Sequence, residues 1–302
     1  MIVRPRLPWL RMLFVRRGSI VNKVLPQQTF IFLLSCTVVF FHGDLLGHHI
    51  NLTSAPFSLM GVALAIFLGF RINASYDRYW EARKLWGAIL VDSRNLARLA
   101  LTLPPRAVPV RPFVLGLAAL AAALRNHLRG LDARHGQEGL LPADVLDTVS
   151  RKQNVPLALL LWLGEGVRRM RAEGLDPLLS LQMEKGLDNL SQAMAGCERI
   201  ASTPLPFAYT VILHRSSYLY CMLLPFGLEE TVGPMMPLVV AFVSYTFFTL
   251  EELSHEIEEP FGLQDNDLPL DAMVVGVEAS LRELLGEAPP PLPKPDGNCV
   301  LT

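Results

Sequence analysis

Ionisable side chains interrupt or follow two apolar parts of this sequence. His214 and Arg215 lie inside the apolar run 205–228, where a charge without water around it is costly and often functional. The alternative is that the run is short and that Arg215 reaches its polar edge or packs against protein. A second group follows the uncharged run 231–250, and it could attract cations or form a solvated helix face. Its members are Glu251, Glu252, Glu256, Glu258 and Glu259.

Patterns typical of catalytic or metal centres are missing from the sequence. We find no nucleophile–base pair, HExxH motif, phosphate-binding loop or paired acid motif, which argues against an enzyme. The cysteines have neither CxxC nor metal-site spacing, so we expect reduced thiols at Cys36, Cys197, Cys221 and Cys299. A formal net charge of −1 indicates no basic surface for nucleic acid. We therefore predict no cofactor, no resident metal and no nucleic-acid partner.

The elements that carry these residues are predicted from windows with few charges. A membrane-spanning helix needs about 20 mostly apolar residues. Residues 24–43 and 231–250 carry no charged side chain, and residues 55–70 begin a helix that we expect to continue beyond the membrane. Residues 205–228 form the remaining candidate, interrupted by its two ionisable residues. The sequence therefore predicts four membrane spans.

The distribution of basic residues predicts the orientation of these spans. Cytoplasmic loops carry an excess of Lys and Arg. Residues 71–204 contain 18 of them, whereas the loops between the first two spans and between the last two contain none. Both termini and residues 71–204 are therefore predicted to be cytoplasmic, and His48 and Glu229 to face outside. The basic residues before the first span are Arg4, Arg6, Arg11, Arg16, Arg17 and Lys23.

The long middle segment is expected to be helical but outside the lipid. Its apolar run 113–124 has only twelve residues, which is typical of a buried core helix rather than a span. Residues 183–200 mix charged and apolar side chains at helical spacing, as an amphipathic helix does. The tail 287–302 is rich in proline and is predicted to be disordered.

Four short patterns give the chain a family resemblance. They are RGSI at 17–20, GFRINASYDRYWEARKLW at 69–86, TPLPFAYT at 203–210 and EPFG at 259–262, the last followed by Asp265, Asn266 and Asp267. They occur in the order found in bestrophins and cover residues 16 to about 275. The chain resembles the bacterial branch of that family most closely.

The resemblance implies an all-α membrane protein that assembles as a homopentamer around a central pore. Each subunit would have four transmembrane helices and a helical cytoplasmic domain, and would lie in the bacterial inner membrane with both termini cytoplasmic. Its segments are expected to be an N-terminal part with two transmembrane helices (1–76), a helical cytoplasmic domain (77–204), two transmembrane helices (205–250), a cytoplasmic helical region (251–286) and the tail (287–302).

The resemblance also assigns pore residues. The family's hydrophobic neck residues fall on Val62, Ile66 and Phe70, whose spacing of four places them on one helix face. Five copies would form three stacked apolar rings, a constriction that gates by excluding water. Judged from spacing alone, these three apolar residues could equally serve to pack α-helices against one another in the membrane. A lower constriction is expected among Leu178, Leu179 and Leu181.

The permeant ion is expected to be small and monovalent. We expect a cation, because the bacterial branch is associated with monovalent cations and because acidic residues would lie at the inner mouth. Those residues are Glu251, Glu252, Glu256 and Glu258. The alternatives are an anion (chloride) channel of the same fold and a secondary transporter, although the sequence has no internal repeat.

Calcium regulation is in doubt for this chain. Animal relatives bind the ion in an acidic cluster after the PFG pattern. Residues 263–267 here lack the dense carboxylates that a calcium site of 6 to 8 oxygen ligands favours. We expect Asp265, Asn266 and Asp267 to cap or turn the chain instead.

Overall fold

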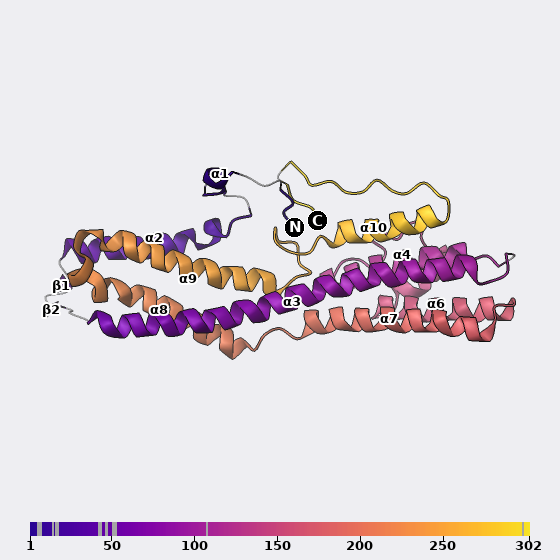
Figure 1. The fold of residues 1–302 in the computed structure, drawn as a ribbon, viewed down its shortest axis with the longest axis horizontal. Coiled ribbons are helices and arrows are strands. Elements are labelled where there is room, and N and C mark those ends of the chain that lie inside the picture. The colour runs from indigo at the N-terminus through magenta and orange to yellow at the C-terminus, as the bar shows by residue number, and fades with distance from the viewer. Residues whose placement is uncertain are drawn as a thin grey trace. The chain divides into compact units, whose positions relative to one another are not determined.

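The computed structural model describes residues 1–4, 8–13, 15, 18–41, 44–45, 48–49, 53–106, 108–297 and 299–302. Within these ranges most of the chain is helical, which confirms the all-α class (Figure 1). The two short strands β1 (Asp44–Leu45) and β2 (His48–His49) pair antiparallel. Arg6, Arg16 and Arg17 of the basic N-terminal segment lie outside the described residues. The helices are α1 (Trp9–Leu13), α2 (Val21–Phe40), α3 (Ser54–Thr102), α4 (Arg111–Arg129), α5 (Ala143–Ser150), α6 (Val155–Ala172), α7 (Pro177–Ser202), α8 (Phe207–Val232), the 3-10 helix η1 (Gly233–Met235), α9 (Met236–Glu258) and α10 (Leu270–Leu284).

The chain divides into two compact units. The first, called the apolar unit below, comprises Pro5–Tyr79 and Pro204–Glu259. The second, called the charged unit, comprises Met1–Arg4, Trp80–Thr203 and Pro260–Thr302. The division separates the four predicted spans from most of the long segment rich in Lys and Arg, which enters the charged unit at Trp80. The finer division into five segments stays a prediction.

The apolar unit is built from α2, α8, α9 and the first part of α3. Helix α2 packs against α8 and α9, which also pack against each other (Figure 1). Because the uncharged windows place aliphatic and aromatic side chains all around these helices, each can bury some of them and expose others. The buried core consists of Val24, Ile31, Val38, Leu64, Leu68, Tyr220, Cys221, Leu224, Met236, Val240, Phe247 and Phe248.

Polar side chains in this unit bond to backbone carbonyls. The hydroxyl of Ser35 donates to the carbonyl of Ile31 at 2.8 Å. In α9, Ser244 donates to the carbonyl of Val240, also at 2.8 Å. In an apolar medium a hydroxyl without such a bond would be costly, so these residues are compatible with spanning helices.

Three helical segments in the described residues are long and apolar enough to cross a membrane. They are Val21–Phe40, Ala55–Thr102 and Phe207–Glu258. The predicted continuation of the second helix is confirmed, because α3 is one helix of 49 residues. The third segment contains both α8 and α9, of 26 and 23 residues. Four separate spans therefore stay a prediction.

The junction between α8 and α9 depends on one glycine. Gly233 follows the last residue of α8 with φ of 60°, in the left-handed region that residues with a Cβ rarely adopt. Pro234 is the next residue and belongs to η1, where it needs no hydrogen-bond donor. These two residues allow the chain to leave one long helix and begin the next.

The charged unit is organised around α4. All residues from Phe113 to Asn126 are buried, and α4 packs against α6, α7 and α10. A Cβ at Gly116 would lie 2.5 Å from Trp162 Cζ3, so glycine permits the close approach of α6. The prediction that the run 113–124 forms a core helix is confirmed.

The remaining parts of the charged unit include an amphipathic helix and paired chain ends. The predicted amphipathic helix 183–200 falls within α7, which buries Met183, Leu187, Leu190, Met194 and Cys197 at helical spacing. Ile2 and Val300 form a bridge, and the amide of Val3 donates to the carbonyl of Cys299 at 2.8 Å. The proline content of the tail does not predict this pairing. All four cysteines are free.

Candidate functional site

The residues predicted to form the pore neck lie along one outward face of α3. Val62, Ile66 and Phe70 are 60%, 53% and 61% exposed. Leu64 and Leu68 are only 6% and 2% exposed and belong to the core of the apolar unit. A spacing of four residues keeps side chains on one helix face, whereas a shift of two moves them to the opposite side. The predicted neck residues therefore face away from the core of their own unit.

The buried face of α3, which carries Leu64 and Leu68, continues with polar residues. Arg71 and Ser75 follow the two buried leucines at helical spacing and are themselves buried. The Oγ atoms of Ser75 and Ser254 lie 2.9 Å apart, and Arg71 Nη2 lies 3.6 Å from Glu258 Oε2. Because polar groups buried this deeply require partners, these contacts fix which face of α3 packs against α9.

Exposure alone does not separate a pore face from a lipid face. Leu59, Met60 and Phe67 of α3 are also exposed, so the apolar surface is broader than the row of three. Lipid and the axis of an assembly are both suitable surroundings for such a surface. The pore role of the predicted neck stays a prediction.

The predicted lower constriction lies at the beginning of α7, in the charged unit. Leu178, Leu179 and Leu181 are exposed, whereas Ser180 between them is buried. Asp176 caps the helix, because its side chain accepts hydrogen bonds from the amides of Leu178 and Leu179 at 2.7 and 3.2 Å. The three leucines are thus held on a rigid helix start, and their role in the pore stays a prediction.

The acidic run at the end of α9 is largely internal. Glu251, Glu256 and Glu258 are buried, and Glu252 is half-buried. The alternative that the acidic run forms a solvated helix face is therefore wrong for three of its five glutamates. Glu259, which follows α9, is exposed.

Each of these buried carboxylates has a polar partner. Lys23 Nζ lies 2.7 Å from Glu256 Oε1 and 3.3 Å from Glu252 Oε1. His214 Nδ1 lies 2.7 Å from Glu251 Oε1. Glu258 contacts Arg71, as described above, and accepts from the amide of Leu205 at 3.1 Å. Because cations balance much of this charge, the run offers less attraction to a passing ion than its sequence suggests.

Sequence reasoning missed Arg71 and Lys23 as members of this array. A signal for Arg71 was present, since it follows Leu64 and Leu68 at intervals of seven and three residues, on the same helix face. For Lys23 the only signal was its place at the edge of an uncharged window. His214, which the sequence marked as unusual, contacts Glu251, whereas Arg215 is exposed.

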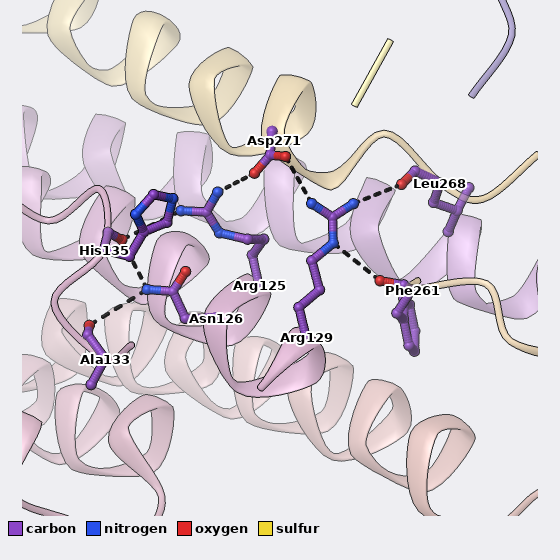
Figure 2. Close-up of polar contacts among 8 residues, drawn as sticks. All are labelled: Arg125, Asn126, Arg129, Ala133, His135, Phe261, Leu268 and Asp271. Atoms are coloured by element: carbon purple, nitrogen blue, oxygen red, sulfur yellow. Dashed lines mark hydrogen bonds and ion pairs between the residues drawn. The ribbon is translucent and has the colours of Figure 1, made fainter. Parts of the chain in front are cut away.

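A second polar cluster, in the charged unit, joins α4 to the first turn of α10 and to the segment before it. Figure 2 shows the side chains of Arg125 and Arg129 directed toward Asp271. Arg129 Nη1 lies 2.8 Å from Asp271 Oδ2, and Arg125 pairs with the other carboxylate oxygen. Arg129 also donates to the carbonyls of Phe261 and Leu268, at 3.1 and 3.4 Å. Arg125, Arg129 and Asp271 thus form an ion-pair cluster, called the clamp below, in which both arginine side chains are buried.

The charge state of Asp271 follows from this clamp. Burial by itself would raise the pKa of its carboxyl group. The charge of Arg129 and the hydrogen bond from Arg125 outweigh burial and lower the pKa below its ordinary value. The carboxylate therefore remains ionised while it holds both guanidinium groups.

The clamp holds the segment that follows the PFG pattern. Asp267 accepts a hydrogen bond from the amide of Gln264 at 2.7 Å, which confirms the predicted turn at this residue. Among the residues that the structure describes, no group of three or more His, Cys, Asp or Glu side chains is placed to hold a metal ion. The carbonyls of Phe261 and Leu268 already accept from Arg129.

Comparison with known sequences identifies the family. The family described as bacterial/fungal bestrophin protein matches residues 1–283. This chain belongs to the bestrophin family. It is 49% identical over 291 residues to a voltage-dependent anion channel-forming protein of Ralstonia nicotianae, covering 95% of each chain. It is 43% identical over 289 residues to the voltage-dependent anion channel-forming protein YneE of Escherichia coli K12, again covering 95% of each.

Solved structures agree with this assignment. A bacterial bestrophin homologue from Klebsiella pneumoniae, solved by Zn-SAD phasing, has a TM-score of 0.84 and 38% sequence identity. The similarity covers 88% of this bestrophin and 100% of that chain. This bestrophin is therefore a membrane protein and an ion channel rather than an enzyme. The expected preference for cations finds no support in these comparisons, since the names of both relatives refer to anions.

Proposed function

We propose that this bestrophin is a homopentameric channel for small monovalent ions, with a hydrophobic neck lined by α3. The observation that carries the proposal is the division of α3 into two rows. Leu64 and Leu68 pack in the core, whereas Val62, Ile66 and Phe70 face outward. Five outward rows around one axis would form three apolar rings. Each ring would oppose the passage of ions because it strips water from them without offering a polar replacement.

The proposed channel has four spans in each subunit. In this proposal α2, the first part of α3, α8 and α9 cross the bacterial inner membrane, and both termini are cytoplasmic. The lengths of α8 and α9, 26 and 23 residues, are each sufficient for a span. The dense Lys and Arg content of residues 71–204 favours the cytoplasm for the segment that follows the second span.

A second narrow point is proposed below the neck. Leu178, Leu179 and Leu181 are exposed at the capped start of α7. Apolar side chains on a fixed helix start can form a ring of constant diameter in a symmetric assembly. An ion would then meet two apolar constrictions in series.

The sign of the permeant ion has two candidate answers. The names of the relatives favour anions. The resemblance to the bacterial branch favours cations, but the acidic run adds little to this, because Glu251, Glu256 and Glu258 are buried and paired. An apolar neck excludes water and does not by itself select a charge sign.

Recordings from purified protein in a planar bilayer test the proposal. Unitary currents are expected, whereas a transporter or an enzyme would give none. In a salt gradient, the reversal potential moves toward the equilibrium potential of the permeant ion and so distinguishes anions from cations. Absence of unitary currents from protein that is folded and inserted would overturn the channel proposal.

A further inference from the structure

The apolar unit contains a cavity of about 490 Å³ that the proposed pore does not use. Its walls come from α2, α3, α8 and α9, and all of its lining residues belong to this one unit. The volume lies in the range of small-molecule sites in proteins, about 300–1,000 Å³. Its charged lining makes it a candidate for a polar ligand.

Arg71 lines the cavity with unmet hydrogen-bonding capacity. Its residue is 1% exposed, and its Nε and Nη1 atoms are buried without a hydrogen-bond partner. Its contact with Glu258, from Nη2 at 3.6 Å, is longer than a hydrogen bond. A buried guanidinium with two unused donor atoms is destabilising unless a ligand, water or another chain accepts from them.

Glu251 lines the same cavity with the opposite charge. Its residue is 8% exposed. One carboxylate oxygen, Oε1, contacts His214 Nδ1 at 2.7 Å, whereas Oε2 is buried and has no partner. The cavity wall therefore contains two unpaired donor atoms on a cation and one unpaired acceptor atom on an anion, all three buried in this structure.

The other lining residues keep this balance of charge. Arg215 and Glu252 add one further group of each sign, and Val24, Phe207 and Val211 supply apolar surface. A simple anion would be attracted by the arginines and repelled by the glutamates, and a simple cation would meet the reverse. A zwitterion whose two charged groups reach both kinds of residue satisfies the lining best.

The positions of the lining residues in the predicted spans indicate the source of such a zwitterion. Val24, Phe207 and Glu251 lie at the predicted cytoplasmic ends of three spans, where lipid headgroups meet the protein. We propose that the cavity binds a phosphate ester whose short alkyl chain carries a primary ammonium group, as in the headgroup of phosphatidylethanolamine. In the bound state the side chains of Arg71 and Glu251 turn toward the ligand, so that Arg71 donates to the phosphate and Glu251 Oε2 accepts from the ammonium.

Lipid binding to the purified full-length protein tests this assignment. Native mass spectrometry from detergent would count bound phosphatidylethanolamine, phosphatidylcholine and phosphatidylglycerol. We expect phosphatidylethanolamine to bind about tenfold tighter than the other two, because one lacks ammonium hydrogens and the other lacks the ammonium. Equal binding of all three lipids, or no bound lipid on the intact assembly, would overturn the proposal.

Two variants connect the binding to the cavity. Glu251→Gln keeps the size of the side chain and its contact with His214, and should remove the preference over phosphatidylcholine. Arg71→Gln should weaken binding of all three lipids, by roughly tenfold or more. Glu259→Gln and Arg78→Gln are the matched controls, because neither residue lines the cavity. If the Arg71→Gln variant does not assemble, lipid binding by Glu251→Gln is the deciding test. An unchanged lipid preference in Glu251→Gln would contradict the assignment.

A soluble competitor identifies the source of the ligand. If phosphoethanolamine displaces the lipid at equal concentration, the site recognises the free zwitterion as well as the headgroup. If only the lipid binds, the acyl chains contribute and the ligand is the membrane lipid itself. Both results support the recognition of a phosphate ester that carries a primary ammonium group. The assay does not depend on ion conduction, so a failed channel recording and a failed binding test are separate outcomes.

Discussion

Ile66 and Leu64 lie two residues apart on α3 and face opposite ways: Ile66 is more than half exposed, and Leu64 is buried in the core of the apolar unit. This difference turns the proposed neck into an experiment on two neighbouring aliphatic side chains. The same truncation to alanine should act on current at one position and on stability at the other.

We predict that Ile66→Ala raises conductance or open probability and leaves the assembly stable. The shorter side chain widens the middle apolar ring, and an exposed residue has few packing contacts to lose. Leu64→Ala should instead lower the free energy of unfolding by about 2–5 kcal/mol, without a gain in current. Single-channel recording together with thermal unfolding checks both. Similar behaviour of the two variants would show that the neck has been assigned to the wrong face.

The second prediction concerns topology. In a background with the four native cysteines replaced by serine, a cysteine at Glu229 should react with a membrane-impermeant thiol reagent added outside intact cells. A cysteine at Arg106 should react only after the cells are opened, because dense positive charge keeps residues 71–204 in the cytoplasm. Labelling of the residue 106 cysteine from outside would contradict the proposed orientation.

The third prediction is that the purified protein is a homopentamer. The exposed apolar row Val62, Ile66 and Phe70 can line a closed pore only if several subunits surround one axis. Mass measurement in mild detergent should give five times the 33.5 kDa chain. A stable monomer or dimer with native helix content would rule out this pore.

The fourth prediction concerns the clamp in the charged unit. Asp271→Asn should lower the free energy of unfolding by about 1.5–3 kcal/mol, since Arg125 and Arg129 are buried and would lose an ionised partner. Asp147→Asn is the control, because Asp147 pairs with Arg134 on the surface, and exposed pairs contribute about 0–1 kcal/mol. Thermal unfolding of both variants in the same detergent measures the difference. Equal losses would mean that the clamp does not stabilise the fold.

The fifth prediction is the pH dependence of this clamp. The pKa of Asp271 is lowered in the folded protein relative to its ordinary value of 3.8. Its stabilising effect is therefore fully present above that value and is lost as the pH falls through the lower folded pKa. The stability difference between wild type and Asp271→Asn should be constant near neutral pH and should shrink in acid below about pH 3.8. A difference that grows on acidification would have the wrong sign.

Composition and periodicity were sufficient to predict most of the helices. The uncharged windows locate α2, the first part of α3 and α9, because a helix surrounded by apolar groups must itself be apolar along its length. The short run 113–124 was correctly assigned to a core helix on length alone. The opposite faces of Ile66 and Leu64 also follow from helical spacing, although spacing does not say which face is buried.

The sequence by itself determined the all-α class, the places of the long apolar helices and the membership of the bestrophin family. Only the tertiary structure decided the partners of the buried charges. Glu256 meets Lys23, Glu258 meets Arg71, and Asp271 meets Arg125 and Arg129, all across long separations in sequence. The physical reason is that hydropathy and helical spacing are properties of neighbouring residues. An ion pair forms only if the fold brings a distant helix with the opposite charge next to the glutamate. The same glutamate would otherwise be solvated.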